Sequence, residues 1–251
     1  MNIGIIVQAR MGSTRFPGKI LHPFYKDKVL IDVILENLHR IPDTKLIVAT
    51  SINPENDTLE NYLNSKGENI YRGSEEDVLN RFIQAAQHYD VNGIIRICSD
   101  NPFLDYEGLS TLTKRARESN CDYIGFSVNG TPSILTHLGF WGEYVSLNAL
   151  KRVESETAIN TPAHEHVTYH VYTHPNEYQC EWIECPSFLK NRKDIRLTVD
   201  NVQDLKNTSR IYRELIDHKG SFSIDDVVSY IDRHTHIRES MLKNIAINVK
   251  S

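Results

Sequence analysis

The residues best suited to chemistry gather in a short loop near the N-terminus. The apolar, β-branched run Ile3–Val7 is followed directly by Gln8-Ala9-Arg10-Met11-Gly12-Ser13-Thr14-Arg15-Phe16-Pro17-Gly18-Lys19. Glycine exposes backbone N–H groups and the cations neutralise negative charge, so this junction of strand and loop suits a polyphosphate. It lacks the GxxxxGK(S/T) and GxGxxG patterns of other phosphate loops. The alternative is a solvated basic loop whose glycines serve only the turn geometry.

Two carboxylates stand at the ends of predicted buried strands. Asp100 follows the apolar run Gly93–Cys98, and Asp200 ends the run Asp194–Asp200. Ligands of open α/β sheets bind outside the carboxyl ends of the strands, and Mg²⁺ is usually held by one or two carboxylates together with substrate phosphates. If the two carboxylates meet across the sheet, they would form a Mg²⁺ site. The alternatives are structural, because Asp before Pro is common in turns and Asp200 could cap the following helix.

Two further polar clusters stand where a nucleotide could bind. Thr50 and Ser51 close an apolar run with small hydroxylated residues, which would leave room for a flat ring. Arg72 precedes Gly73-Ser74-Glu75-Glu76-Asp77 and could reach a base or a phosphate. Ser74 followed by Asp77 also resembles a capping box, so this second cluster has a structural explanation as well.

Short apolar runs alternate with helical spacings along the chain. Apolar runs of three to seven residues predict strands, and apolar residues three or four apart predict helices. The predicted strands are Ile3–Val7, Lys45–Thr50, Asn69–Tyr71, Gly93–Cys98, Asp122–Phe126, Glu181–Glu184 and Asp194–Asp200, and the predicted helices are Ile31–Leu38, Asp57–Lys66, Glu75–His88, Leu109–Ser119, Val202–Ile216 and Ile224–His234. This alternation predicts an α/β fold with one mostly parallel sheet and helices on both faces. We expect Ile245–Ser251 to be a tail.

Residues 129–190 break the alternation. They contain an aromatic cluster around Trp141 and the unusual run Pro162-Ala163-His164-Glu165-His166-Val167-Thr168. We interpret this segment as an insertion that returns strands to the sheet, binds the acceptor and supplies a dimer arm, within one domain of residues 1–251.

Composition limits the class of protein. The chain has 251 residues, of which 40% are apolar and 24% charged, as in ordinary globular proteins. A net charge of −5 argues against non-specific nucleic-acid binding. The four cysteines form no CxxC pair, which is typical of reduced thiols and indicates neither a disulfide framework nor a zinc site. No run approaches the ~20 apolar residues of a membrane span, and no signal-peptide pattern is present, so we expect a cytoplasmic protein with no membrane partner.

The loop sequence QARMGSTRFPGKIL resembles the N-terminal signature of the sugar-acid cytidylyltransferases, which include the acylneuraminate and 3-deoxy-manno-octulosonate enzymes. The resemblance continues, in the same order, over nearly the whole chain: VATS at Val48–Ser51, RGSEEDVLNRF at Arg72–Phe82, RICSDNPFLD at Arg96–Asp105, HEHVT at His164–Thr168 and RLTVDNVQDL at Arg196–Leu205. The motifs are most similar to the spore-coat polysaccharide biosynthesis branch. The resemblance implies a three-layer, GT-A-like (Rossmann-like) fold, a homodimer, and a reaction that uses CTP and Mg²⁺.

The resemblance also implies roles for individual residues. Catalysis would involve Lys19, Arg10 and Asp100, and Asp100 and Asp200 would hold Mg²⁺. Substrate contacts are expected from a wider set, namely Gln8, Ala9, Gly12, Ser13, Arg15, Thr50, Ser51, Arg72, Ser74, Glu143, Glu165 and His166. The chain departs from the family pattern at Ser99-Asp100-Asn101-Pro102, where Gly-Asp-Cys-Pro is frequent, at His164 and over Ser133–Gly142. These departures leave the identity of the acceptor sugar open.

The implied reaction transfers CMP from CTP to a small sugar acid, releases pyrophosphate and serves surface polysaccharide or glycan biosynthesis. Such a transfer depends chiefly on positioning and on neutralising charge, with His166 as a candidate base. One alternative is a nucleotidyltransferase that uses another NTP or a sugar-phosphate acceptor. A GT-A glycosyltransferase is disfavoured because no Asp-x-Asp motif follows the Gly93–Cys98 run. A non-catalytic nucleotide-binding protein would not be expected to keep both carboxylates and the basic loop.

Overall fold

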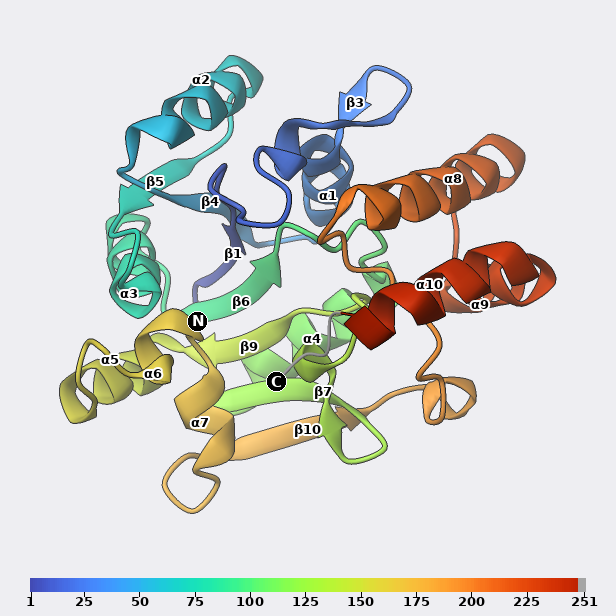
Figure 1. The fold of residues 1–251 in the computed structure, drawn as a ribbon. Coiled ribbons are helices and arrows are strands. Elements are labelled where there is room, and N and C mark those ends of the chain that lie inside the picture. Colours follow the sequence, from blue (N-terminus) through green and yellow to red (C-terminus); the bar gives the residue numbers. More distant parts are fainter. Residues whose placement is uncertain (248–251) are drawn as a thin grey trace.

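A mixed eight-stranded sheet forms the centre of the computed structural model, which describes residues 1–247 (Figure 1). The strand order is β10-β7-β9-β6-β1-β4-β5, and β8 pairs with β7. The strands of this sheet are β1 (Ile3–Gln8), β4 (Lys45–Ser51), β5 (Ile70–Gly73), β6 (Gly93–Cys98), β7 (Tyr123–Val128), β8 (Thr131–Pro132), β9 (Glu143–Ser146) and β10 (Cys180–Glu184). A separate hairpin joins β2 (Pro23–Tyr25) to β3 (Lys28–Val29).

Most of the sheet is parallel. Neighbouring strands are parallel from β6 through β1 and β4 to β5, and β7 is parallel to β10. Strand β9 lies between β6 and β7 and pairs antiparallel with both. The strands β8, β9 and β10 all come from residues 129–190, so this segment does return strands to the sheet. β10 is an edge strand.

Helices cover both faces of the sheet, as predicted. They are α1 (Leu30–Leu38), α2 (Asp57–Lys66), α3 (Val78–His88), α4 (Tyr106–Glu118), α5 (Leu147–Glu156), α6 (Pro162–Glu165), α7 (Tyr169–Thr173), α8 (Val202–Lys219), α9 (Ile224–Arg233) and α10 (Thr235–Ile247). Apolar residues of α1, α2, α4 and α8–α10 share one core, and those of α3 and α5–α7 share the other. Along β1, Ile5 and Val7 enter the first core and Ile6 enters the second, because successive strand side chains point to opposite faces. None of the helices within residues 1–247 is long and apolar enough to cross a membrane.

Two sequence predictions at the C-terminal end are wrong. Residues 194–200 form no strand, because N–H groups of this segment bond to loops: Leu197 to the His137 carbonyl at 2.8 Å and Val199 to the Asp100 carbonyl at 2.9 Å. The predicted tail is helical in its first three residues, which end α10, and residues 248–251 lie outside the described part. Only Ile237 and Met241 of α10 are buried, so its sequence carries a weak helical pattern.

Candidate active site

The loop after β1 folds around one carbonyl group. The Met11 carbonyl accepts hydrogen bonds from the N–H groups of Ser13 at 2.9 Å and Gly18 at 2.8 Å, and the Met11 N–H donates to Asn56 Oδ1 at 2.8 Å. Gly18 has a φ of 69°, in the left-handed region that favours glycine. This turn delivers Lys19, the first residue of a short 3-10 helix, Lys19–Leu21, to the centre of the site.

Other residues of the predicted phosphate loop lie against β4 and the helix that follows it. Ala9 is buried, and its N–H donates to the Ala49 carbonyl at 3.2 Å. Gly12 passes close to Glu55: a Cβ at Gly12 would lie 2.1 Å from the Glu55 carboxylate. Gly12 and Ser13 are half-buried. A larger residue at position 12 would therefore have to displace Glu55.

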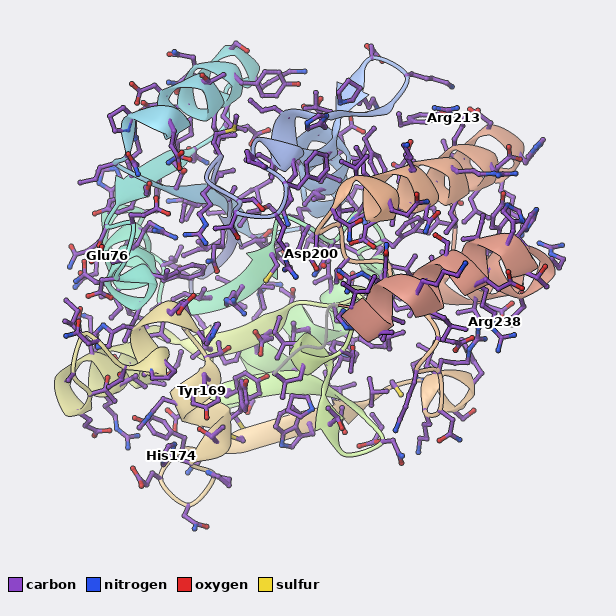
Figure 2. All side chains as sticks on the ribbon, viewed as in Figure 1. Glu76, Tyr169, His174, Asp200, Arg213 and Arg238 are labelled. Atoms are coloured by element: carbon purple, nitrogen blue, oxygen red, sulfur yellow. The ribbon has the colours of Figure 1, made fainter. Side chains whose placement is uncertain are left out.

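The ammonium group of Lys19 lies between two carboxylates. Its Nζ donates to the Val199 carbonyl at 2.7 Å and lies 3.6 Å from Asp100 Oδ2 and 3.7 Å from Asp200 Oδ1. Arg15 Nη2 lies 3.1 Å from the same Asp200 oxygen. The Val199–Asp100 backbone bond described above fastens the two acidic turns together. The structure thus brings together Arg15, Lys19, Asp100 and Asp200. Figure 2 shows Asp200 near the centre of the view, whereas Glu76 and His174 lie towards its rim.

Neither carboxylate is used as a helix cap. Asn201 is the N-cap of α8, and its side chain accepts from the Asp204 N–H at 2.9 Å. Asp105 caps α4 by accepting from the Gly108 N–H at 2.7 Å. The capping alternative for Asp200 is therefore excluded.

The two carboxylates fit a hard divalent cation. Both face one positive charge, the Lys19 ammonium, at distances below 4 Å, so their oxygens already converge on a cation. The side chains of Asp100 and Asp200 keep 24% and 12% exposure, which leaves them open to a ligand. Carboxylates supplemented by phosphate oxygens are the usual protein environment of Mg²⁺.

Arg10 lies on another side of the loop. Its Nη1 donates to Glu75 Oε1 at 2.7 Å, in the turn before α3. Burial opposes ionisation of Glu75, but hydrogen bonds from Ser51 and Arg10 outweigh it and lower the pKa of this carboxyl. Arg10 thus pairs with Glu75, and a role shared with Asp100 and Asp200 would act through a ligand that spans the loop.

The segment predicted to surround a base borders an open pocket. Residues 52–54 and 73–76 line a pocket of about 580 Å³, and Thr50 and Ser51 are buried beside it. Arg72 is held by β4 and α2: it donates to the Ser51 carbonyl at 3.0 Å and pairs with Asp57 at 2.7 Å and with Glu60. In the structure Arg72 therefore connects β4 to α2, and its expected contact with a base or a phosphate stays a prediction.

The cap of α3 differs from the predicted capping box. Asp77 is itself the N-cap and accepts from the Asn80 N–H at 2.9 Å. Ser74 forms a turn before it, in which the hydroxyl accepts from the Asp77 N–H at 3.0 Å. The capping residue is thus Asp77, three residues later than expected.

Glu143 and Gln8 meet at a buried arginine. Arg96 donates to Glu143 Oε2 at 2.8 Å and to Gln8 Oε1 at 3.2 Å. Glu143 also accepts from the Tyr123 hydroxyl at 2.6 Å and the Thr168 hydroxyl at 3.1 Å, and it is 1% exposed. Burial, reinforced by Glu143, holds the pKa of Tyr123 well above its ordinary value. Glu143 is thus enclosed by protein groups, and its expected contact with the sugar stays a prediction.

The structure places Glu165 and His166 at the exposed end of α6. The buried histidine of this run is instead His164, whose Nδ1 lies 2.9 Å from Asp77 Oδ1. This pair connects α6 to the start of α3.

Sequence reasoning misses Arg196, a fully buried arginine that bonds to Asp200 at 2.7 Å. The available signals are its charge inside the apolar run before Asp200 and its place at the start of the motif RLTVDNVQDL.

Comparisons with known proteins show the family of the chain. The family model described as Cytidylyltransferase matches residues 4–225. The chain is 31% identical to the spore coat polysaccharide biosynthesis protein SpsF of Bacillus subtilis (strain 168), over 93% of this chain and 95% of that protein.

Solved structures give the same picture. A cytidylyltransferase from Leptospira borgpetersenii serovar Hardjo-bovis has a TM-score of 0.80 at 26% identity, with 94% of this chain and 96% of that chain covered. A CMP:2-keto-3-deoxy-manno-octonic acid synthetase in complex with CTP has a TM-score of 0.63 at 14% identity, with 84% and 98% covered. The second likeness shows a shared fold.

Proposed function

Because this chain belongs to the cytidylyltransferase family, and is therefore a CTP-dependent nucleotidyltransferase, we propose that it transfers CMP from CTP to a small sugar acid and releases pyrophosphate. The proposed role is surface polysaccharide or glycan biosynthesis. The relative SpsF, named for spore coat polysaccharide biosynthesis, and the fold shared with a sugar-acid CMP synthetase support this choice of acceptor.

The observation that carries the proposal is the convergence of Lys19, Asp100 and Asp200. The Lys19 ammonium lies within 3.7 Å of both carboxylates, and Arg15 Nη2 lies 3.1 Å from Asp200 Oδ1. A triphosphate with its divalent cation carries both negative and positive charge. It can therefore replace the ion pairs between these side chains with its own contacts to each of them. The cation would bind Asp100 and Asp200, and the phosphate oxygens would bind Lys19 and Arg15.

In the proposed reaction, an anionic or hydroxyl oxygen of the acceptor forms a bond to the α-phosphorus of CTP, and the proton of a hydroxyl passes to a base, for which His166 is the candidate. The bond from that phosphorus to the oxygen bridging to the β-phosphorus breaks, and its electron pair leaves with pyrophosphate. Lys19 stabilises negative charge on the α-phosphoryl oxygens, while Arg15 and Arg10 stabilise the departing pyrophosphate. Mg²⁺, when bound, supplies further neutralisation of the same charge.

We propose that residues 129–190 bind the acceptor and form the contact with the partner subunit. This segment supplies β9 and β10, which lie with β7 on the side of the sheet beyond β6, and its exposed residues Glu165 and His166 would contact the sugar acid, with His166 as candidate base. We also propose a cytoplasmic homodimer, supported by the edge strand β10 and by the exposed aromatic side chains of Tyr169 and Phe188 in this segment. Light scattering on the purified protein tests the dimer.

The function is tested by pyrophosphate release with Mg²⁺. Each of the four NTPs is combined with a panel of nonulosonic acids and, separately, with a panel of sugar 1-phosphates. We expect release with CTP and a sugar acid, and a CMP-sugar in the product. Release with sugar 1-phosphates alone, or equally with another NTP, would contradict the proposal.

A further inference from the structure

One guanidinium group organises the acidic side of the proposed metal site. Arg196 has no exposed side-chain surface. It donates to Asp200 Oδ2 at 2.7 Å, to Asp204 Oδ1 and Oδ2 at 2.8 and 3.0 Å, and to His137 Nδ1 at 2.7 Å. A fully buried charge is retained only where it is paired and hydrogen-bonded in this way.

These bonds divide the two oxygens of Asp200 between different tasks. Oδ2 is held by Arg196, whereas Oδ1 faces Lys19 at 3.7 Å and Arg15 at 3.1 Å. The Asp200 N–H donates to Asp204 Oδ2 at 3.1 Å, so the backbone of the turn is fixed as well. The carboxylate therefore presents Oδ1 to the loop and cannot turn without breaking a buried charge-assisted bond.

The same network reaches the C-terminal helix. Asp204 Oδ1 also accepts from Asn244 Nδ2 at 2.9 Å, and Asn244 lies on α10. A continuous path thus runs from α10 through Asp204 and Arg196 to Asp200. Figure 1 shows α10 lying beside α8, the helix that begins next to Asp200.

We propose that Arg196 is a positioning residue for Asp200, and that Asn244 makes α10 part of the apparatus that sets the metal affinity of the site. The inference rests on the proposed function, because it takes Asp200 as a metal ligand. Residues that orient a metal ligand typically change metal affinity or activity by roughly 10- to 100-fold when they are replaced.

The test measures binding of Mn²⁺ in the presence of CTP, by electron paramagnetic resonance of the free ion and by calorimetry. Asn244→Leu removes the bond to Asp204 with little change in size, and we expect the Kd of Mn²⁺ to rise about 10-fold. Arg196→Lys keeps the charge but loses the planar fork, and we expect a rise towards 100-fold. Binding of CTP without metal should stay unchanged in both variants.

Ser240→Ala is the matched control. Ser240 Oγ accepts from Asn207 Nδ2 at 3.0 Å at the same contact between α10 and α8, so its bond goes to Asn207 and not to the Asp204 carboxylate. We expect wild-type Mn²⁺ affinity from this variant. Equal weakening in Ser240→Ala and Asn244→Leu would overturn the inference, because general loosening of α10 would then explain both.

The outcomes separate the inference from the proposed function. If the wild type binds Mn²⁺ with CTP and Asn244→Leu binds it equally well, the inferred influence of α10 on metal affinity is wrong and the proposed function stands. If the wild type binds no Mn²⁺ in the presence of CTP, both fail. Asn244 is half-buried and uncharged, so its variant decides the question even if Arg196→Lys does not fold.

Discussion

Two charged clusters, one on strand β6 and one beyond its end, differ in how their charges are compensated. In the buried cluster of Arg96, Tyr123, Glu143 and Thr168, both carboxylate oxygens accept bonds of 2.6 to 3.1 Å, and Glu143 is 1% exposed. In the strand-end cluster of Arg15, Lys19, Asp100 and Asp200, Lys19 lies 3.6 and 3.7 Å from the carboxylates, which remain partly exposed. Short buried bonds resist exchange, whereas longer contacts near solvent can be replaced by a ligand's charges. The comparison favours a stabilising role for the first cluster and supports the proposed ligand binding at the second.

The largest expected effect breaks the buried cluster. Glu143→Leu leaves the Arg96 guanidinium buried without its carboxylate, so we expect the free energy of unfolding to fall by about 3–5 kcal/mol. Chemical denaturation followed by circular dichroism measures it. Glu184→Leu, at an exposed position of β10, is the control and should change stability by less than about 0.5 kcal/mol. A wild-type midpoint for Glu143→Leu would show that the cluster does not stabilise the fold.

The next effect falls on activity. Lys19→Ala removes the cation between the two carboxylates, and we expect turnover to fall roughly 10²- to 10³-fold, the scale of losing one electrostatic stabiliser. Its unfolding free energy should fall less than that of Glu143→Leu, because Arg15 and Arg196 still compensate Asp200. Lys28→Ala, which removes an exposed pair with Glu36, is the control. Undiminished turnover in Lys19→Ala would remove the proposed role of the strand-end cluster.

A milder change tests the buried cluster from its edge. Tyr123→Phe deletes the hydroxyl that donates to Glu143 Oε1 at 2.6 Å and leaves that oxygen without this donor. We expect a loss of about 1–3 kcal/mol in the free energy of unfolding. Tyr169→Phe, on an exposed tyrosine, should be neutral in the same denaturation experiment. An equal response of the two variants would contradict the contrast between buried and exposed groups.

The smallest effect concerns pH and the pair of Arg10 with Glu75. The pKa of Glu75 is lowered from its ordinary value of 4.5, despite burial, by bonds from Ser51 and Arg10. A lowered pKa in the folded state means that the pair stabilises fully above pH 4.5, and that this contribution is lost as the pH falls through the folded-state pKa. We expect the wild type to lose more stability than Glu75→Gln between pH 5 and pH 3, by less than about 1 kcal/mol. Parallel acid titrations of thermal stability measure the difference, and identical slopes would refute it.

Much of the fold is predictable because its signals are local. The strands β1, β4 and β6 are apolar runs buried on both faces, and the helices α1 to α4 repeat apolar residues at helical spacing. The 194–200 segment reads like another such strand, yet its N–H groups bond to loops and not to a strand. Its composition alone could not reveal this, because composition reports burial and not the partner of each backbone group.

The candidate site divides in the same way. The basic loop and the acidic turns can be located from sequence, because glycine and charge after an apolar run are visible in the order of residues. The sequence does not reveal that Glu143 is enclosed while Asp200 is partly exposed, since both are acidic residues next to apolar segments. Glu143 is enclosed by groups 20 to 47 residues away, while Asp200 is reached by Arg15 from 185 residues away.

The sequence by itself determined the alternating α/β pattern, the position of the basic glycine-containing loop and the membership in a family of nucleotidyltransferases. Only the tertiary structure decided which charged groups are enclosed and which are partly exposed, and which residue caps each helix. It also decided that Arg196 bonds to Asp200 and that Asn244 connects to this pair through Asp204. The physical reason is that the energy of a charge depends on its burial and on its partners, and these are supplied by elements remote in the sequence.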